Sequence, residues 1–204
     1  MTVVYGAFAA LLVLFGAVIM MLEILSSNLM SPYFGGSVFI WGSIISSIMV
    51  HLSVGYVLGG YFARKAARTT TLLLLLAAGS VWVILIPFFH PPVCEFIANA
   101  IEDVRYGSLA AMNVIFFIPI TIMAMVSPYV IGILAEYRRR SRLTAGMILF
   151  ISTIGSFVGT NVTAFYLINL FPISGIVRSI GILCLAVSIV LLFFRIDDRL
   201  RAGE

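Results

Sequence analysis

Polar, glycine-containing or proline-containing breaks divide the chain into six long apolar stretches. A helix that crosses the hydrocarbon core needs about 20 apolar residues, and separate strands would leave backbone groups unsatisfied in lipid. The pattern therefore predicts an all-α polytopic membrane protein, with six transmembrane helices in a single transmembrane domain over residues 1–204. The predicted spans are Val3–Leu29, Val38–Phe62, Thr71–Phe89, Leu109–Leu134, Leu143–Leu170 and Ile176–Phe194.

Composition agrees with this prediction and excludes two other classes of protein. Hydrophobic residues make up 62% of the chain and charged residues 10%, whereas soluble domains carry roughly 25% charged residues. So few charges would not cover a water-facing surface. The sequence pI of 9.3 does not indicate a nucleic-acid binder, because the basic residues are confined to short segments between spans.

The basic residues predict the orientation of the chain in the membrane. Ten of the twelve follow the second, fourth and sixth spans, and cytoplasmic loops are enriched in Lys and Arg. We therefore expect both termini to be cytoplasmic and the longest outer loop, about His90–Gly107, to lie on the other side. The ten residues are Arg64, Lys65, Arg68, Arg138, Arg139, Arg140, Arg142, Arg195, Arg199 and Arg201.

Six spans also suggest two repeats of three helices. Repeats with an odd number of spans have opposite topology, an arrangement that recurs in transporters. The tripeptide Ser-Pro-Tyr occurs at residues 31–33 and again at 127–129, near the end of the first helix of each expected repeat. We therefore predict a bundle built from two three-helix halves.

Glu23 is the acidic residue that interrupts an apolar run. A carboxylate costs free energy inside a membrane, so such residues usually face a cavity or a partner and are candidates for function. Helical spacing places Glu23 on one face with Gly16, Met20, Ser26 and Ser27. The alternative is a structural carboxylate that is hydrogen-bonded or reaches the interface. The expected solute-binding residues are Glu23, Ser27, Asn28, His51, Thr160 and Asn161.

Two GxxxG patterns predict close helix–helix contacts. Gly55 and Gly59 form one of them in the second span, and Gly155 and Gly159 form the other in the fifth. Small residues at this spacing let helix backbones approach each other. Packing is therefore the favoured role for these glycines, and lining of a solute pathway is the alternative.

Recognisable chemistry beyond these features is lacking in the sequence. The two cysteines, Cys94 and Cys184, are predicted to lie in an outer loop and in the middle of a span, so they are not expected to pair. No CxxC, HExxH, Walker or dinucleotide-binding pattern is present. We expect no metal site and no cofactor. Glu23 and His51 alone do not make a nucleophile–base pair, so we expect no enzyme.

Several short motifs, in order and spacing, resemble one family. They are Leu22-Glu23-Ile24, Pro32-Tyr33-Phe34-Gly35, Trp41-Gly42, Gly55-Tyr56, Gly59-Gly60, Ser127-Pro128-Tyr129, Ser152-Thr153-Ile154-Gly155-Ser156 and Gly159-Thr160. Over about Gly16–Pro172 the chain resembles the membrane domain of the spermidine synthase-like (fused major-facilitator/spermidine synthase) integral membrane proteins. In that family the membrane part is commonly followed by a soluble Rossmann-like domain. The sequence here ends at Glu204 without that domain, so the synthase chemistry is not expected of it.

The same family tends to have an Ala-Asp-Arg turn after the second span. Here the turn reads Ala63-Arg64-Lys65, without the acid, so a gating role of the major-facilitator kind is not expected for it.

The leading hypothesis is a transporter-like module that binds or moves a small solute, cationic and polyamine-like if Glu23 is its charge partner. The alternative is a non-transporting membrane scaffold, or anchor subunit, for a separate soluble enzyme or a larger membrane complex. We expect a half-transporter that is completed as a homodimer or by a partner membrane subunit. The bilayer and a separate soluble synthase-like protein are the other expected partners, in a bacterial or archaeal cell (inner) membrane.

Overall fold

The computed structural model describes residues 2–65, 68–137 and 141–194, and all the regular elements in these ranges are helical. In these ranges the helices form six spans that are long and apolar enough to cross a membrane, which confirms the predicted fold class. In chain order the helices are α1 (Thr2–Phe34), α2 (Val38–Lys65), α3 (Thr69–Ala100), α4 (Val104–Ala124), α5 (Val126–Tyr137), α6 (Ser141–Val162), the π-helix η1 (Thr163–Leu167), α7 (Ile168–Leu170) and α8 (Ile173–Phe193).

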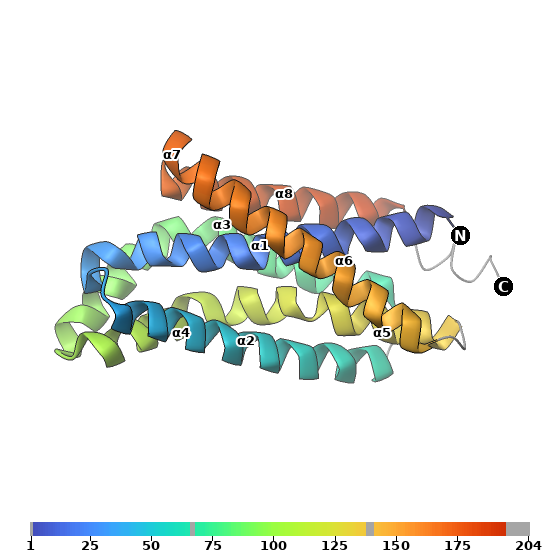
Figure 1. Cartoon of the computed structure of the whole chain (residues 1–204), viewed down its shortest axis with the longest axis horizontal. Helices are drawn as coiled ribbons and strands as arrows, with labels where there is room; N and C mark the ends of the chain where they lie inside the picture. Colours follow the sequence, from blue (N-terminus) through green and yellow to red (C-terminus); the bar gives the residue numbers. More distant parts are fainter. Residues whose placement is uncertain (1, 66–67, 138–140, 195–204) are drawn as a thin grey trace.

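Three extensive helix pairings organise the bundle. The first helix, α1, packs mainly against α6; α2 packs against α4 and α5; and α3 packs against α8 and α4. In Figure 1, α2 and α6 lie toward the viewer, α6 crosses α1 obliquely, and the fainter α3 and α8 lie behind. One side of the bundle is therefore formed by α2 and α6, with α1 and α4 between the two layers.

The third span is longer than the sequence pattern predicts. Instead of ending at Phe89, α3 continues through Pro91 and Pro92 to Ala100, so the predicted outer loop His90–Gly107 is wrong for most of its length. Proline is tolerated in membrane helices because neighbouring groups re-satisfy the freed carbonyl oxygens. Cys94 is consequently a buried helical residue, not a loop thiol.

The fourth and fifth spans are each interrupted. A turn at Met125 separates α4 from α5, and the N–H of Met125 donates to Ile122 at 3.2 Å. In the fifth span, α6 passes into the π-helix, where the N–H of Ile168 donates to the carbonyl oxygen of Thr163. Breaks of this kind often occur at functional sites, and the interruption at Met125 adjoins the pocket described below.

The glycines of both GxxxG patterns lie against neighbouring backbone. A Cβ on Gly159 would lie 2.5 Å from the carbonyl oxygen of Ala17, and a Cβ on Gly155 would overlap the carbonyl oxygen of Val13. On α2, a Cβ on Gly59 would lie 2.7 Å from the carbonyl oxygen of Met125. These close backbone contacts are possible because glycine has no side chain.

The described basic side chains lie toward both ends of the bundle. The N-terminal end of α1, the C-terminal end of α2 and the C-terminal end of α8 lie at the same end (Figure 1), and this end carries Arg64, Lys65 and Arg68. Arg105 and Arg178 lie toward the opposite end, where Arg105 pairs with Asp103 at 3.3 Å. The side chains of the predicted basic loops at 138–142 and 195–201 lie outside the described residues.

Cysteine labelling tests the predicted orientation. Because Cys94 is buried, an introduced thiol is needed at each end. Glu102→Cys places one on the exposed connection between α3 and α4, and Arg64→Cys places one at the opposite end. We expect a membrane-impermeant maleimide to label Glu102→Cys in intact cells and Arg64→Cys only after permeabilisation. The reverse pattern would show that the basic end is outside.

Candidate functional site

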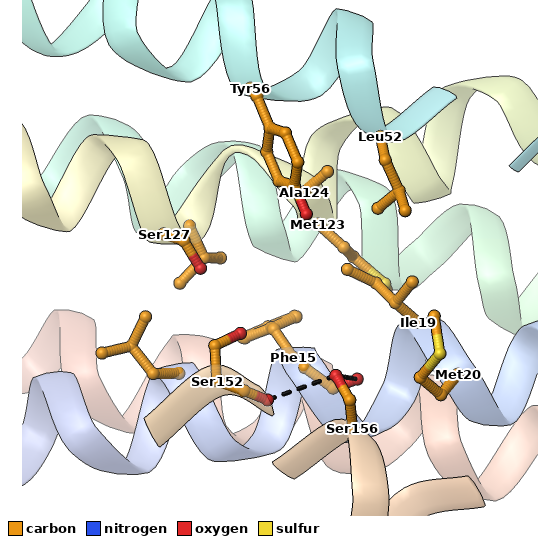
Figure 2. A pocket seen from close by; sticks show the side chains of 13 residues that line it. Phe15, Ile19, Met20, Leu52, Tyr56, Met123, Ala124, Ser127, Ser152 and Ser156 are labelled. Carbon is orange, nitrogen blue, oxygen red and sulfur yellow. Dashed lines mark hydrogen bonds between the residues drawn. The ribbon is translucent and has the colours of Figure 1, made fainter. Parts of the chain in front are cut away.

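A small pocket lies where four spans meet. It has a volume of about 60 Å³ and is lined from α1, α2, the α4–α5 junction and α6. Its α1 wall includes Gly16 and Met20, and Gly16 lies near the midpoint of its helix. Figure 2 shows Tyr56, Ser127, Ser152 and Ser156 converging on this space from α2, α5 and α6. The pocket therefore places several hydroxyl groups near the middle of the bundle.

One of these hydroxyl groups is held in place by hydrogen bonds. The Ser156 Oγ donates to the carbonyl oxygen of Gly16 at 3.0 Å and to that of Ser152 at 3.2 Å, the second shown as a dashed line in Figure 2. The bond from Ser156 to Gly16 connects α6 to α1 on the pocket wall. Tyr56 is 49% exposed on α2 while its ring also lines the pocket, so the pocket adjoins the outer surface of the α2–α6 side.

Glu23 lies beyond this pocket. It follows Met20 by three residues, a separation of about 4.5 Å along the axis toward the Phe34 end. Its side chain is half-buried, and among the described residues its carboxylate has no hydrogen bond or ion pair. Only the backbone carbonyl of Glu23 is bonded, accepting from the Ser26 Oγ at 2.7 Å. The carboxylate therefore stands near the pocket without a charge partner in the described chain.

His51 lies elsewhere, in a polar seam between α2 and α4. It is fully buried, and its Nε2 lies 3.0 Å from Oδ1 of Asn113. The Asn113 amide also donates to the Ser47 Oγ at 3.3 Å, and the ring of Phe117 meets the imidazole edge-on. This seam joins two helices and does not line the pocket, so the structure separates His51 from Glu23.

The other expected solute-binding residues differ in their positions. Ser27 is half-buried, one turn beyond Glu23 on the same face of α1. Thr160 is half-buried one turn beyond Ser156, and its Oγ1 donates to the Ser156 carbonyl at 2.9 Å. Asn28 is exposed and bonds its own helix at Ile24. The Asn161 amide likewise donates within α6. Ser27 and Thr160 thus lie on the helix faces that continue from the pocket along α1 and α6, and the two asparagines do not.

None of the 13 residues that line the pocket is among the predicted solute-binding residues. In the sequence Tyr56 lies within a glycine pattern, and Ser127 lies within a repeated tripeptide. The signal that would have found Ser127 is the sequence Ser-Pro within an apolar run, because proline frees carbonyl groups and marks an interruption in a membrane helix.

Within the described part of the chain, no three His, Cys, Asp or Glu side chains are placed to hold a metal ion. Comparison of the chain with protein-family models, with curated proteins and with solved structures gives no match. The resemblance to the spermidine synthase-like membrane proteins therefore stays a prediction from the motifs.

Proposed function

We propose that the protein is a transporter-like membrane module that binds a small cationic solute at the four-span pocket, with Glu23 as its charge partner. The supporting observation is the unpaired carboxylate of Glu23, one turn from a hydroxyl-lined pocket near the middle of the bundle. A carboxylate within a membrane span is expected to face a cavity, water or a cation. Tyr56 and Ser127 supply oxygens for hydrogen bonds or cation coordination.

The pocket size restricts what binds in this conformation. A cavity needs roughly 10–15 Å³ of volume for each water molecule, so about 60 Å³ accommodates a few waters or one small cation. An extended polyamine needs more room. If a polyamine is the solute, the α2–α6 side has to open, whereas a proton or a small monovalent cation requires no such opening.

The scaffold alternative makes a different prediction for the same residues. A scaffold needs a rigid bundle and a docking surface, and it gains nothing from an unpaired carboxylate, which costs free energy. The hydroxyl groups of the pocket would then be helix contacts only, and their removal would leave any solute flux unchanged.

Uptake by proteoliposomes distinguishes the two functions, and Tyr56→Phe is the first variant to compare. We expect the unsubstituted protein to move at least one solute from a panel of protons, sodium, ammonium and polyamines. Because Tyr56→Phe removes one pocket hydroxyl and retains the ring, we expect uptake to fall by about tenfold, the effect of roughly 1.4 kcal/mol. Tyr61→Phe is the matched control, since Tyr61 is exposed on α2 and does not line the pocket. No flux of any panel solute would favour the scaffold.

A further inference from the structure

Of the three spans that are covered least by their own chain, two are also the least apolar of the six. The fifth span is 22% buried with a mean hydropathy of 1.5, and α2 is 33% buried with a mean hydropathy of 1.7. The other four spans have values from 2.3 to 2.6. A helix that exposes most of its surface to lipid is expected to be strongly apolar. The exposed positions of α2 and the fifth span are themselves largely apolar, but they also include glycines and hydroxyl residues, such as Ser53 and Thr153.

The last helix, α8, provides an internal comparison. It is 33% buried, the same fraction as α2, but its mean hydropathy is 2.6. Its exposed positions include Ile182, Leu183 and Ile189. From Ile182 to Phe193 every exposed position of α8 is apolar, whereas the exposed positions of α2 include Ser46 and Ser53. With equal coverage by the chain, the exposed surface of α2 is therefore the less apolar of the two.

Exposed residues on α2 follow a regular spacing of four and three residues. Such spacing, sustained over several turns, is typical of a seam along which two helices pack. All six positions are exposed in the bundle, and a Cβ on Gly42 or on Gly60 would meet no atom within 4 Å. The residues, in order from the Lys65 end, are Gly60, Tyr56, Ser53, Met49, Ser46 and Gly42.

The outward side of the fifth span carries a seam of the same spacing and the same order of residue types. Gly146 lies five residues after the first residue of α6, just as Gly60 lies five residues before the last residue of α2. From there both seams continue with an aromatic residue, a hydroxyl, a large residue, a hydroxyl and a small residue. On the fifth span these are Gly146, Phe150, Thr153, Phe157, Thr160 and Ala164, all exposed except the half-buried Thr160.

We propose that the α2–α6 side is the interface of a homodimer, in which α2 of each copy packs antiparallel against α6 of the other. A second copy is the occupant that the seams indicate, because a two-fold axis along the membrane normal covers both of them at once. Within one chain α2 and α6 run in opposite directions, so the pairing between copies is antiparallel. It places residues at equal depth opposite each other, Ser53 facing Thr153.

The dimer also completes the pocket. Tyr56 belongs to the α2 seam and lines the pocket, so a helix packed on that seam closes the pocket on its open side. The interface itself does not depend on transport, since a dimeric scaffold would use the same surface. Loss of uptake and loss of dimerisation are therefore separate results.

Disulfide crosslinking between two differently tagged, co-expressed copies tests the interface. We expect Ser53→Cys on one copy to crosslink with Thr153→Cys on the other in native membranes, and more efficiently than either variant with itself. Leu85→Cys with Ile182→Cys, both exposed on the α3–α8 side, should give no crosslinked dimer. The unsubstituted chain supplies the background of the two buried cysteines. Absence of the Ser53–Thr153 product, or a stronger Ser53–Ser53 product, would overturn the proposed pairing.

A steric pair of variants provides a second measurement. Ser53 bonds only the Met49 carbonyl of its own helix, so Ser53→Leu should fold normally but hold two helices apart. We expect its dimer dissociation constant in liposomes, measured by energy transfer on dilution, to rise by roughly tenfold. Ala78→Leu makes the same change in bulk at an exposed position of α3 and should leave dimerisation unchanged. Equal dimerisation of both variants, or a monomeric parent protein, would refute the interface.

Discussion

Gly159→Leu is expected to prevent the bundle from assembling. A Cβ at this position would lie 2.5 Å from the carbonyl oxygen and 2.7 Å from the Cα of Ala17. Both atoms belong to backbone, so no side-chain rotation relieves the overlap and α6 has to move away from α1. Overpacking a core costs about 1–3 kcal/mol where side chains adjust, and more where backbone moves. This pairing is among the most extensive in the fold, so we expect a large loss of yield and thermal stability.

The control for this variant is Gly6→Leu, on α1, the helix against which Gly159 packs. A Cβ on Gly6 meets nothing within 4 Å, so the added side chain points away from the chain's own packing. Yield and thermal unfolding in detergent should separate the two variants, with Gly6→Leu resembling the parent protein. A Gly159→Leu protein with normal yield and melting temperature would show that α1 and α6 are not in close contact.

The sequence was sufficient to predict six membrane helices because apolar length alone determines what can cross a bilayer. It misplaced the end of the third span because the sequence His90-Pro91-Pro92 is typical of a loop. In a membrane bundle such residues remain helical when neighbouring groups satisfy the freed carbonyls. Cys94 was misassigned for the same reason, since its predicted location depended on that loop.

The candidate site could be predicted only in part, because helical periodicity places residues on one helix but does not pair faces of different helices. The stripe that carries Gly16, Met20 and Glu23 was found from spacing on α1. His51 was grouped with Glu23 only because both are polar residues in apolar runs. Its actual partner, Asn113, comes from a span for which the sequence indicated no polar face.

The pairing of spans also bears on the predicted repeats. Exchanging the first three spans with the last three maps the α1–α6 pairing onto the pairing of α2 with α4 and α5, and maps the α3–α8 pairing onto itself. This is the pattern expected of two halves of opposite topology. It supports the proposal of an inverted repeat, as do the matched seams on α2 and α6.

Glu23→Gln is expected to weaken cation binding strongly and leave the fold intact. The variant retains the size of the side chain and removes its charge. Glu23 lies eleven residues before the end of α1, about 16 Å along the helix, and its side chain is half-buried. Hydrogen bonds to charged groups contribute about 1.5–3 kcal/mol, so we expect binding or uptake to fall by about 10- to 100-fold. Thermal stability should be unchanged or higher, because an unpaired charge has been removed.

Uptake and unfolding of the same proteoliposome preparation check both parts of this expectation. Glu95→Gln is the matched control, since Glu95 is an exposed carboxylate on α3 and its neutralisation makes the same change in net charge. A cation that binds at Glu23 should also raise the melting temperature of the parent protein, because a ligand stabilises the state that it binds, and it should not raise that of Glu23→Gln. If Glu23→Gln is more stable and still takes up the solute at the parent rate, the carboxylate is not the binding group. The cation must then be held elsewhere, or the module does not transport one.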